Sequence, residues 1–179
     1  MSHDAADQEF VRLVDENRRA VQRYVLRRFS DPEGSEDVVI ETFAVAWRKR
    51  NELPPRERES PWLYGIAFRV ISNHRRSRDR QNRLHLRLSR EREAANDEGE
   101  TPRAESSTLL LAMSALGESD RELLRLVYWE RFKYRDVAVA LGISENAVAI
   151  RLTRAKKCLR ALLVNTDPTK DEEEEGVEA

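Results

Sequence analysis

Apolar residues recur at every third or fourth position along most of this chain, and this spacing constrains its fold more than any other feature. Such a repeat places apolar side chains on one side of an α-helix, whereas a half-buried strand needs strict alternation. The sequence contains no strand-like alternation of useful length, no internal repeat and no glycine-rich phosphate loop. It therefore predicts an all-helical (all-α) protein of 179 residues.

Three helices are predicted in the first half of the chain. The first ends at the turn-forming segment 30–35, and Ser35 is expected to cap the second. Pro54 and Pro55 lack backbone donors and predict a loop, after which Ser60 and the proline that follows it begin the third helix. The expected buried stripes are Phe10, Leu13, Val14, Val21, Tyr24, Val25 and Phe29, then Val39, Phe43, Ala46 and Trp47, then Leu63, Ile66, Ala67, Val70 and Ile71.

Segment 93–107 divides the chain. It has almost no large apolar residue and contains Gly99 and Pro102, which predicts a flexible acidic linker. Two small helical domains are therefore expected at residues 1–92 and 108–164, joined by this linker and followed by a disordered acidic tail at 165–179. Apolar periodicity in the second domain begins at Leu109, Leu110, Met113, Leu116, Leu123, Leu124, Val127 and Tyr128.

Charge is strongly segregated although the net charge is only −1. Residues 61–92 contain nine arginines and two acids, and residues 131–160 contain eight basic residues and two acids. Acidic residues gather in the linker and the tail. Two cationic segments separated by an acidic connector suggest two contact points on one polyanion. Each segment taken alone fits a solvated helical face equally well.

Other classes of protein find little support in the sequence. No apolar run approaches the roughly 20 residues that a membrane helix requires, so we expect a cytoplasmic protein without membrane insertion. His3 lies in a start that we expect to be disordered, and His74 and His85 lie in the arginine-rich helix. No nucleophile or set of ligands accompanies these histidines. We therefore expect no enzyme activity, no metal and no cofactor.

Residues 134–157, YRDVAVALGISENAVAIRLTRAKK, have the pattern of a helix-turn-helix. Gly142 permits the tight turn, and Val148 and Leu152 are expected to face the core from the second helix. An exposed Ile150 among cations suits a DNA groove better than water, although an ordinary helical hairpin remains the alternative. The residues expected to contact DNA are Asn146, Ala149, Ile150, Arg151, Thr153, Arg154 and Lys157.

Two stretches of the first domain resemble a known family. SEDVVIETFAVAWRKR and PWLYGIAFRVISNHRRSR resemble region two of the extracytoplasmic-function (ECF) sigma factors of bacterial RNA polymerase. ALGESDRELLRLVYWERFKYRDVAVALGIS resembles their region four, and the order of the motifs matches over nearly the whole chain. The resemblance implies an alternative sigma factor that binds core RNA polymerase, directs it to promoter DNA and helps to melt the DNA.

The resemblance also implies roles for individual residues. In the family, the loop at 51–60 and the helix after it recognise the minus-10 element and hold a flipped base, which assigns minus-10 contacts to Trp62, Arg69, Arg75, Arg76 and Arg78. The helix before the loop docks on the clamp helices of the polymerase, through Asp37, Glu41, Thr42, Phe43, Trp47 and Arg48. Phe43 and Trp47 also fit the core, and packing is the interpretation we favour for these two. The face of residues 146–154 corresponds to the family's minus-35 reader.

Several positions depart from the family pattern. Ile40 stands where glutamine is common, and Arg69 and Asn73 stand where asparagine and aspartate are frequent, so no promoter sequence is inferred. The alternative function is a stand-alone helix-turn-helix transcriptional regulator, which would use the first domain for a ligand or a dimer contact. That domain shows no apolar pocket signature. An anti-sigma factor is left open as a further partner.

Overall fold

The computed structural model describes residues 3–29, 32–89 and 104–164, with side chains for residues 5–29, 34–81 and 109–163. Helices and short turns account for these residues, and no strand occurs among them. The first of two units holds α1 to α3, and the second holds α4, α5, α7 and most of α6. The prediction of an all-α chain with two small helical domains is confirmed. Residues 93–103 of the predicted linker and the predicted tail lie outside the described residues, whereas residues 104–107, which were predicted as linker, form the start of a helix.

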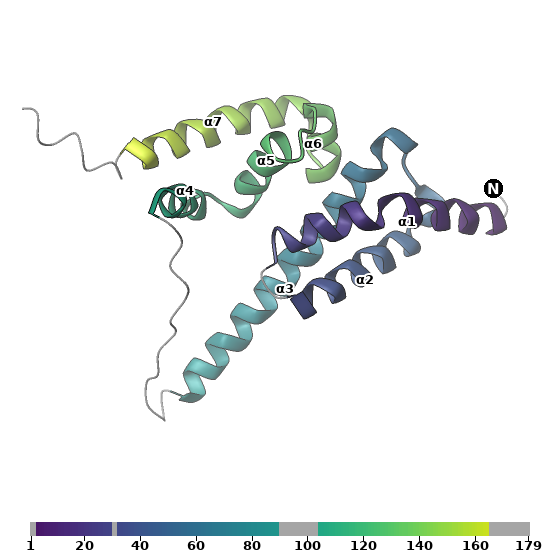
Figure 1. Ribbon diagram of the computed structural model, residues 1–179, viewed down its shortest axis with the longest axis horizontal. Coiled ribbons are helices and arrows are strands. Elements are labelled where there is room, and N and C mark those ends of the chain that lie inside the picture. Colours follow the sequence, from purple (N-terminus) through teal and green to yellow (C-terminus); the bar gives the residue numbers. More distant parts are fainter. Residues whose placement is uncertain (1–2, 30–31, 90–103, 165–179) are drawn as a thin grey trace, which may run out of the picture. The chain divides into compact units, whose positions relative to one another are not determined.

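The first unit is built from α1 (His3–Leu26), α2 (Pro32–Arg48) and α3 (Glu59–Ser89). Each of these helices packs against the other two, and the last turns of α3 project beyond its neighbours (Figure 1). The arginine-rich end of α3 thus extends past the core. The core of the unit contains Leu13, Val21, Tyr24, Val25, Val38, Ala46, Leu63, Ile66, Ala67, Val70 and Ile71.

Two predicted helix boundaries in this unit are wrong. The chain is already helical from His3, and Ala6 is 1% exposed, so the start of the chain is part of the packed unit. α2 begins at Pro32, because a proline with its fixed φ and missing N–H is well suited to a first helical turn. Ser35 is therefore not a cap. It is buried within α2, and its hydroxyl donates to the carbonyl of Phe29 at 3.4 Å.

The predicted buried stripe of α2 is displaced by about one position. Val38, Thr42 and Ala46 are fully buried, whereas Trp47 is 38% exposed. Residues 38–40 are all apolar, and one helix cannot bury three consecutive side chains against the same neighbours. Packing against α1 and α3 selects the orientation of α2 that buries Val38. The Thr42 hydroxyl is satisfied inside the helix by donating to the Val38 carbonyl at 2.7 Å.

The second unit contains α4 (Ala104–Ala115), α5 (Glu118–Tyr128), α6 (Tyr134–Leu141) and α7 (Glu145–Val164). α7 packs against both α4 and α5. Gly142 adopts φ +68°, a left-handed conformation that glycine reaches without steric cost, and so permits the turn between α6 and α7. The amide of Ala147 donates to the Ser144 hydroxyl at 3.2 Å, which caps α7. The core includes Met113, Leu116, Leu123, Leu124, Leu126, Val137, Val148, Leu152 and Ala155.

The stripe of α4 also differs from the prediction. Met113 and Leu116 are buried as expected, but Leu109 and Leu110 are 44% and 51% exposed. Leu111 is 63% exposed as well, so packing against α7 buries Ala112, Met113 and Leu116 and leaves all three consecutive leucines outside the core. Tyr128 at the end of α5, expected to be buried, is 46% exposed.

Candidate nucleic-acid interface

The outward face of α7 carries the side chains that the helix-turn-helix pattern assigned to DNA. Val148, Leu152 and Ala155 are buried on the opposite face, which confirms the predicted orientation of the helix. Ile150 is 45% exposed and has cationic neighbours along the same face. Ala149 is half-buried, and the Thr153 hydroxyl folds back to donate to its carbonyl at 3.0 Å. The exposed members of this face are Asn146, Ile150, Thr153, Arg154 and Lys157.

Arg151 differs from the other cations of this helix. Its Nε and Nη2 atoms lie 2.9 and 2.5 Å from Oδ1 of Asp120 on α5. The pair is about one-third exposed on both sides, and it links α7 to the first turn of α5. The guanidinium of Arg151 is therefore already engaged within the unit, unlike the exposed side chain of Lys157.

The arginines of α3 that were assigned to the minus-10 element fall into two groups. Arg69, Arg76 and Arg78 are exposed, and Trp62 at the start of the helix is half-buried. Arg75 instead turns inward, and its Nη2 donates to the carbonyl of Arg28. The guanidinium of Arg78 lies 5.4 Å from the centre of the Phe29 ring, and Arg76 donates to the Asn73 side chain at 2.9 Å. The exposed part of the predicted minus-10 face therefore consists of Arg69, Arg76 and Arg78.

The loop between α2 and α3 is formed by two short 3-10 turns, Arg50–Glu52 and Arg56–Arg58, on either side of two prolines. The amide of Glu52 donates to the Lys49 carbonyl at 2.9 Å, and the amide of Arg58 donates to the Pro55 carbonyl at 2.8 Å. These turns leave the side chains of residues 51, 52 and 55–58 exposed. The loop thus presents a short polar rim next to the start of α3.

The predicted docking face of α2 is only partly available to a partner. Asp37 and Arg48 are exposed, and Glu41 is half-buried with its carboxylate 2.7 Å from Nε2 of His74. Thr42 is fully buried, so the expectation that its side chain contacts the polymerase is wrong. Ile40, which the sequence singled out only as a departure from the family pattern, is 67% exposed. Its position three residues after Asp37 places both on one helix face.

Phe43 and Trp47 fit the packing role that we favoured for them. Phe43 is half-buried, and the Trp47 ring meets the Phe10 ring edge-on at a centroid distance of 5.0 Å. The guanidinium of Arg50 lies 4.1 Å from the centre of the Trp47 ring. Trp47 is thus held by neighbours on two sides, although it remains 38% exposed.

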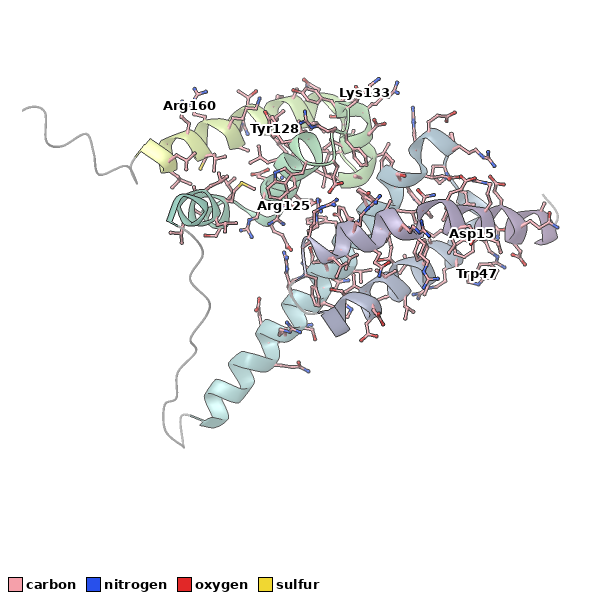
Figure 2. All side chains as sticks on the ribbon, viewed as in Figure 1. Asp15, Trp47, Arg125, Tyr128, Lys133 and Arg160 are labelled. Atoms are coloured by element: carbon pink, nitrogen blue, oxygen red, sulfur yellow. The ribbon has the colours of Figure 1, made fainter. Side chains whose placement is uncertain are left out.

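A second surface of the helix-turn-helix unit is apolar, and the sequence did not predict it. A groove of about 710 Å³ runs between α4, α5 and α7, with Tyr128 and Arg125 contributed by α5 and Arg160 by α7 (Figure 2). The ammonium of Lys156 lies 5.2 Å from the Tyr128 ring centre, and a hydrogen bond with the Tyr128 hydroxyl raises the pKa of Lys156 above its usual range. The groove is lined by Leu109, Met113, Leu124, Arg125, Tyr128, Trp129, Lys156, Leu159, Arg160 and Leu163.

Among residues 3–29, 32–89 and 104–164, no group of three or more His, Cys, Asp or Glu side chains is placed to hold a metal ion. No helix in the same part of the chain combines the length and the apolar character needed to cross a membrane.

Comparison with known protein families identifies both units. Residues 13–81 match Sigma-70 region 2, and residues 106–159 match Sigma-70, region 4. The ECF RNA polymerase sigma factor SigL of Mycobacterium tuberculosis is 30% identical over 157 residues, which cover 84% of this chain and 86% of SigL. The RNA polymerase sigma factor CnrH of Cupriavidus metallidurans is 33% identical over 150 residues, covering 76% of this chain and 78% of CnrH.

Solved structures agree with these matches. The structure of CnrH in complex with the cytosolic domain of CnrY is similar with a TM-score of 0.55 and 25% identity, covering 90% of this chain and 91% of CnrH. The sigma factor RpoE from Bartonella quintana, solved with the anti-sigma factor NepR, has the same fold with a TM-score of 0.52 and 21% identity, covering 90% of this chain and 98% of RpoE. A region 2 unit in front of the helix-turn-helix supports a sigma factor over a stand-alone regulator. The chain therefore belongs to the ECF family of RNA polymerase sigma factors, and it is an alternative sigma factor that binds core RNA polymerase and directs promoter recognition at the start of transcription.

Proposed function

We propose that the exposed face of α7 reads the minus-35 element of the promoter. The observation that carries this proposal is Ile150, a 45% exposed apolar side chain on a face that also holds Arg154 and Lys157. An isoleucine in this setting can contact a thymine methyl group, and Asn146 can both donate to and accept from a base edge. Arg154 and Lys157 then contact phosphates. Arg151 reaches the DNA only by leaving Asp120, so its main role is to hold α7 against α5.

The minus-10 element is assigned to the loop at 51–60 and to α3. The loop presents exposed side chains next to Trp62, and Arg69, Arg76 and Arg78 supply exposed cations along the helix that follows. Extracting a base from the duplex costs a few kcal/mol, which contacts with the loop and with the polymerase must offset. Arg75 contributes less directly, because it is bound to the Arg28 carbonyl.

Core RNA polymerase is assigned to the outer face of α2. Asp37, Ile40 and Arg48 are exposed and recur at helical spacing on that face, and Glu41 lies beside them. Ile40 is 67% exposed and lies beside Asp37 and Glu41 on one face of α2, so a partner that binds these charged side chains would also bury the isoleucine. Ile40 is therefore the central contact that we assign to this face, and Thr42 is left out of it.

The remaining assignments follow from the family. The protein acts in the cytoplasm, where its polymerase and promoter are found, and it contributes binding energy to initiation without a catalytic step of its own. An anti-sigma factor is proposed as a further partner, because the similar structures of CnrH and of RpoE were each solved as complexes, the former with CnrY and the latter with NepR.

If the outer face of α2 binds core RNA polymerase, that binding should depend on Ile40. Ile40→Asp should weaken binding to core polymerase by about tenfold or more, because it places a charge at the centre of the interface. Binding can be measured by titrating labelled protein with core enzyme, and activity by transcription from a cognate promoter. Val11→Asp is the matched control, since Val11 is a branched apolar residue that is 57% exposed on α1. Equal loss in both variants would contradict the assignment of the α2 face.

The α7 assignment predicts that Ile150→Asn changes promoter choice. The new amide should alter which minus-35 sequences support transcription, by about 1–3 kcal/mol at the contacted base pair. Transcription from a library of minus-35 variants measures this change, and titration with core enzyme should show unaltered binding. Unfolding of the second unit by this substitution would instead place Ile150 in the core.

Lys157→Ala should weaken all promoters alike. It removes one phosphate contact, so the slope of log affinity against log salt should become shallower by about 0.9 for the assembled complex. Salt titrations of promoter binding measure this slope. A change confined to particular minus-35 sequences would show that Lys157 reads a base and not the backbone.

A further inference from the structure

Side chains of α1 form ion pairs at both ends of the loop between α2 and α3. At its first residue, Arg50 donates from Nε to Oδ1 of Asp7 at 2.6 Å. Directly after the loop, at the first residue of α3, the Glu59 carboxylate accepts from Arg12, with Nη1 to Oε2 at 3.3 Å. The hydroxyl of Ser60 donates to Oδ1 of Asn17 at 2.7 Å. Three points of the loop region, spread over eleven residues, are therefore tied to one helix.

The ion pair between Glu59 and Arg12 is largely buried. The side chain of Glu59 is 4% exposed and that of Arg12 is 17% exposed. Arg12 also binds Glu9, with Nη2 to Oε1 at 2.6 Å, and Glu16 one turn further along α1. Hydrogen bonds to Glu9 and Glu59 raise the pKa of Arg12, and the hydrogen bond to Arg12 lowers the pKa of Glu9. Both shifts favour the charged forms of Arg12 and Glu9.

The attachment at Arg50 is closer to the surface and is reinforced by a ring. The Arg50 guanidinium lies over the indole of Trp47, and the side chains of Arg50 and Asp7 are 18% and 43% exposed. Between the two attachments, Pro54 and Pro55 restrict the backbone because their φ angles are fixed. The loop is thus held from the side of α1, where the exposed Arg56 also lies 3.9 Å from the carboxylate of Glu9.

We propose that Asp7 and Arg12 are positioning residues for promoter opening, which hold the loop between α2 and α3 in the shape that receives the unpaired minus-10 base. This proposal rests on the minus-10 assignment of the loop made above. A loop that is ordered before binding loses less conformational entropy when it captures the base, so more of the contact energy remains to offset unpairing. In this role Asp7 acts through Arg50, whose Nε donates to its carboxylate.

Asp7→Asn tests the idea without disturbing the buried cluster, because Asp7 is bound to Arg50 and not to Arg12. Hydrogen exchange of the peptide covering residues 50–58 measures the order of the loop in the protein alone. In the complex with core polymerase, promoter opening is measured by the fluorescence of 2-aminopurine placed in the minus-10 element. Asp15→Asn is the matched control, since Asp15 is an exposed carboxylate of the same helix.

We expect faster exchange in the loop and a roughly two- to fivefold lower extent of opening for Asp7→Asn, the range for loss of a partly exposed ion pair. Thermal unfolding and polymerase binding should remain as in Asp15→Asn. Asp7→Glu keeps the charge and should restore most of the opening. Exchange or opening that matches the Asp15→Asn control would overturn the positioning role.

The underlying assignment of the loop has its own test. Asn51→Ala and Arg58→Ala alter exposed side chains of the loop and leave both attachments in place. At least one of them should change opening or minus-10 preference in the same assay. If neither does while Asp7→Asn still speeds exchange in the loop, the minus-10 assignment fails and the attachment to α1 stands as a structural feature.

Discussion

Leu152→Asp is expected to unfold the second unit while the first unit stays folded. Leu152 is 3% exposed on the inner face of α7, the helix that packs against both α4 and α5. Truncating a buried leucine costs about 2–5 kcal/mol, and a carboxylate in its place must also be desolvated or protonated. The free energy of unfolding of a small domain is about 5 kcal/mol or little more, so a loss of this size is enough to unfold it.

Circular dichroism and hydrogen exchange measure this outcome together. The helical signal should fall by the contribution of α4 to α7, and amides of α1 to α3 should retain their protection. Ile150→Asn, two residues earlier in the same helix, is the matched control and should keep the full helical signal because its side chain is exposed. Loss of protection in α1 to α3 would contradict the division into two units that fold separately.

Arg12→Ala is expected to destabilise the first unit by about 3–5 kcal/mol, the range measured when one partner of a buried ion pair is removed. The loss arises at Glu59, whose side chain is 4% exposed and would keep its charge without its main cation. Urea unfolding of the first unit measures the change in its free energy of unfolding. The effect should be much larger than that of Arg19→Ala, which removes an exposed arginine from the same helix.

A second substitution separates charge from packing in this prediction. Glu59→Gln in the Arg12→Ala background removes the unpaired charge and should recover part of the lost stability. No recovery would mean that the aliphatic part of Arg12 matters more than its charge. A change of less than about 0.5 kcal/mol for Arg12→Ala, the usual range at an exposed surface position, would show that the cluster is a surface network of little energetic weight.

Local periodicity determined the class of the fold and the inner faces of two helices. The stripe from Leu63 to Ile71 is buried as predicted, and so are Val148 and Leu152 of the helix-turn-helix. In both helices polar residues flank the apolar ones, so one orientation buries far more apolar area than any other. The turn at Gly142 was also predictable, because only a few residue types adopt its left-handed conformation.

Tertiary packing decided the orientation of helices for which the sequence allowed several. Residues 38–40 and 109–111 are apolar runs that allow several orientations of their helices, and contacts with neighbouring helices select the one that buries Val38 and exposes Ile40. The groove between α4, α5 and α7 follows from the same choice, because it exposes Leu109. The sequence also did not indicate which polar side chains pair with each other. Asp7 and Arg50 are forty-three residues apart, and only folding brings the Arg50 Nε within 2.6 Å of the Asp7 carboxylate. Spacing along the chain reports which face of a helix can be buried, whereas side-chain partners from distant segments depend on how the helices pack.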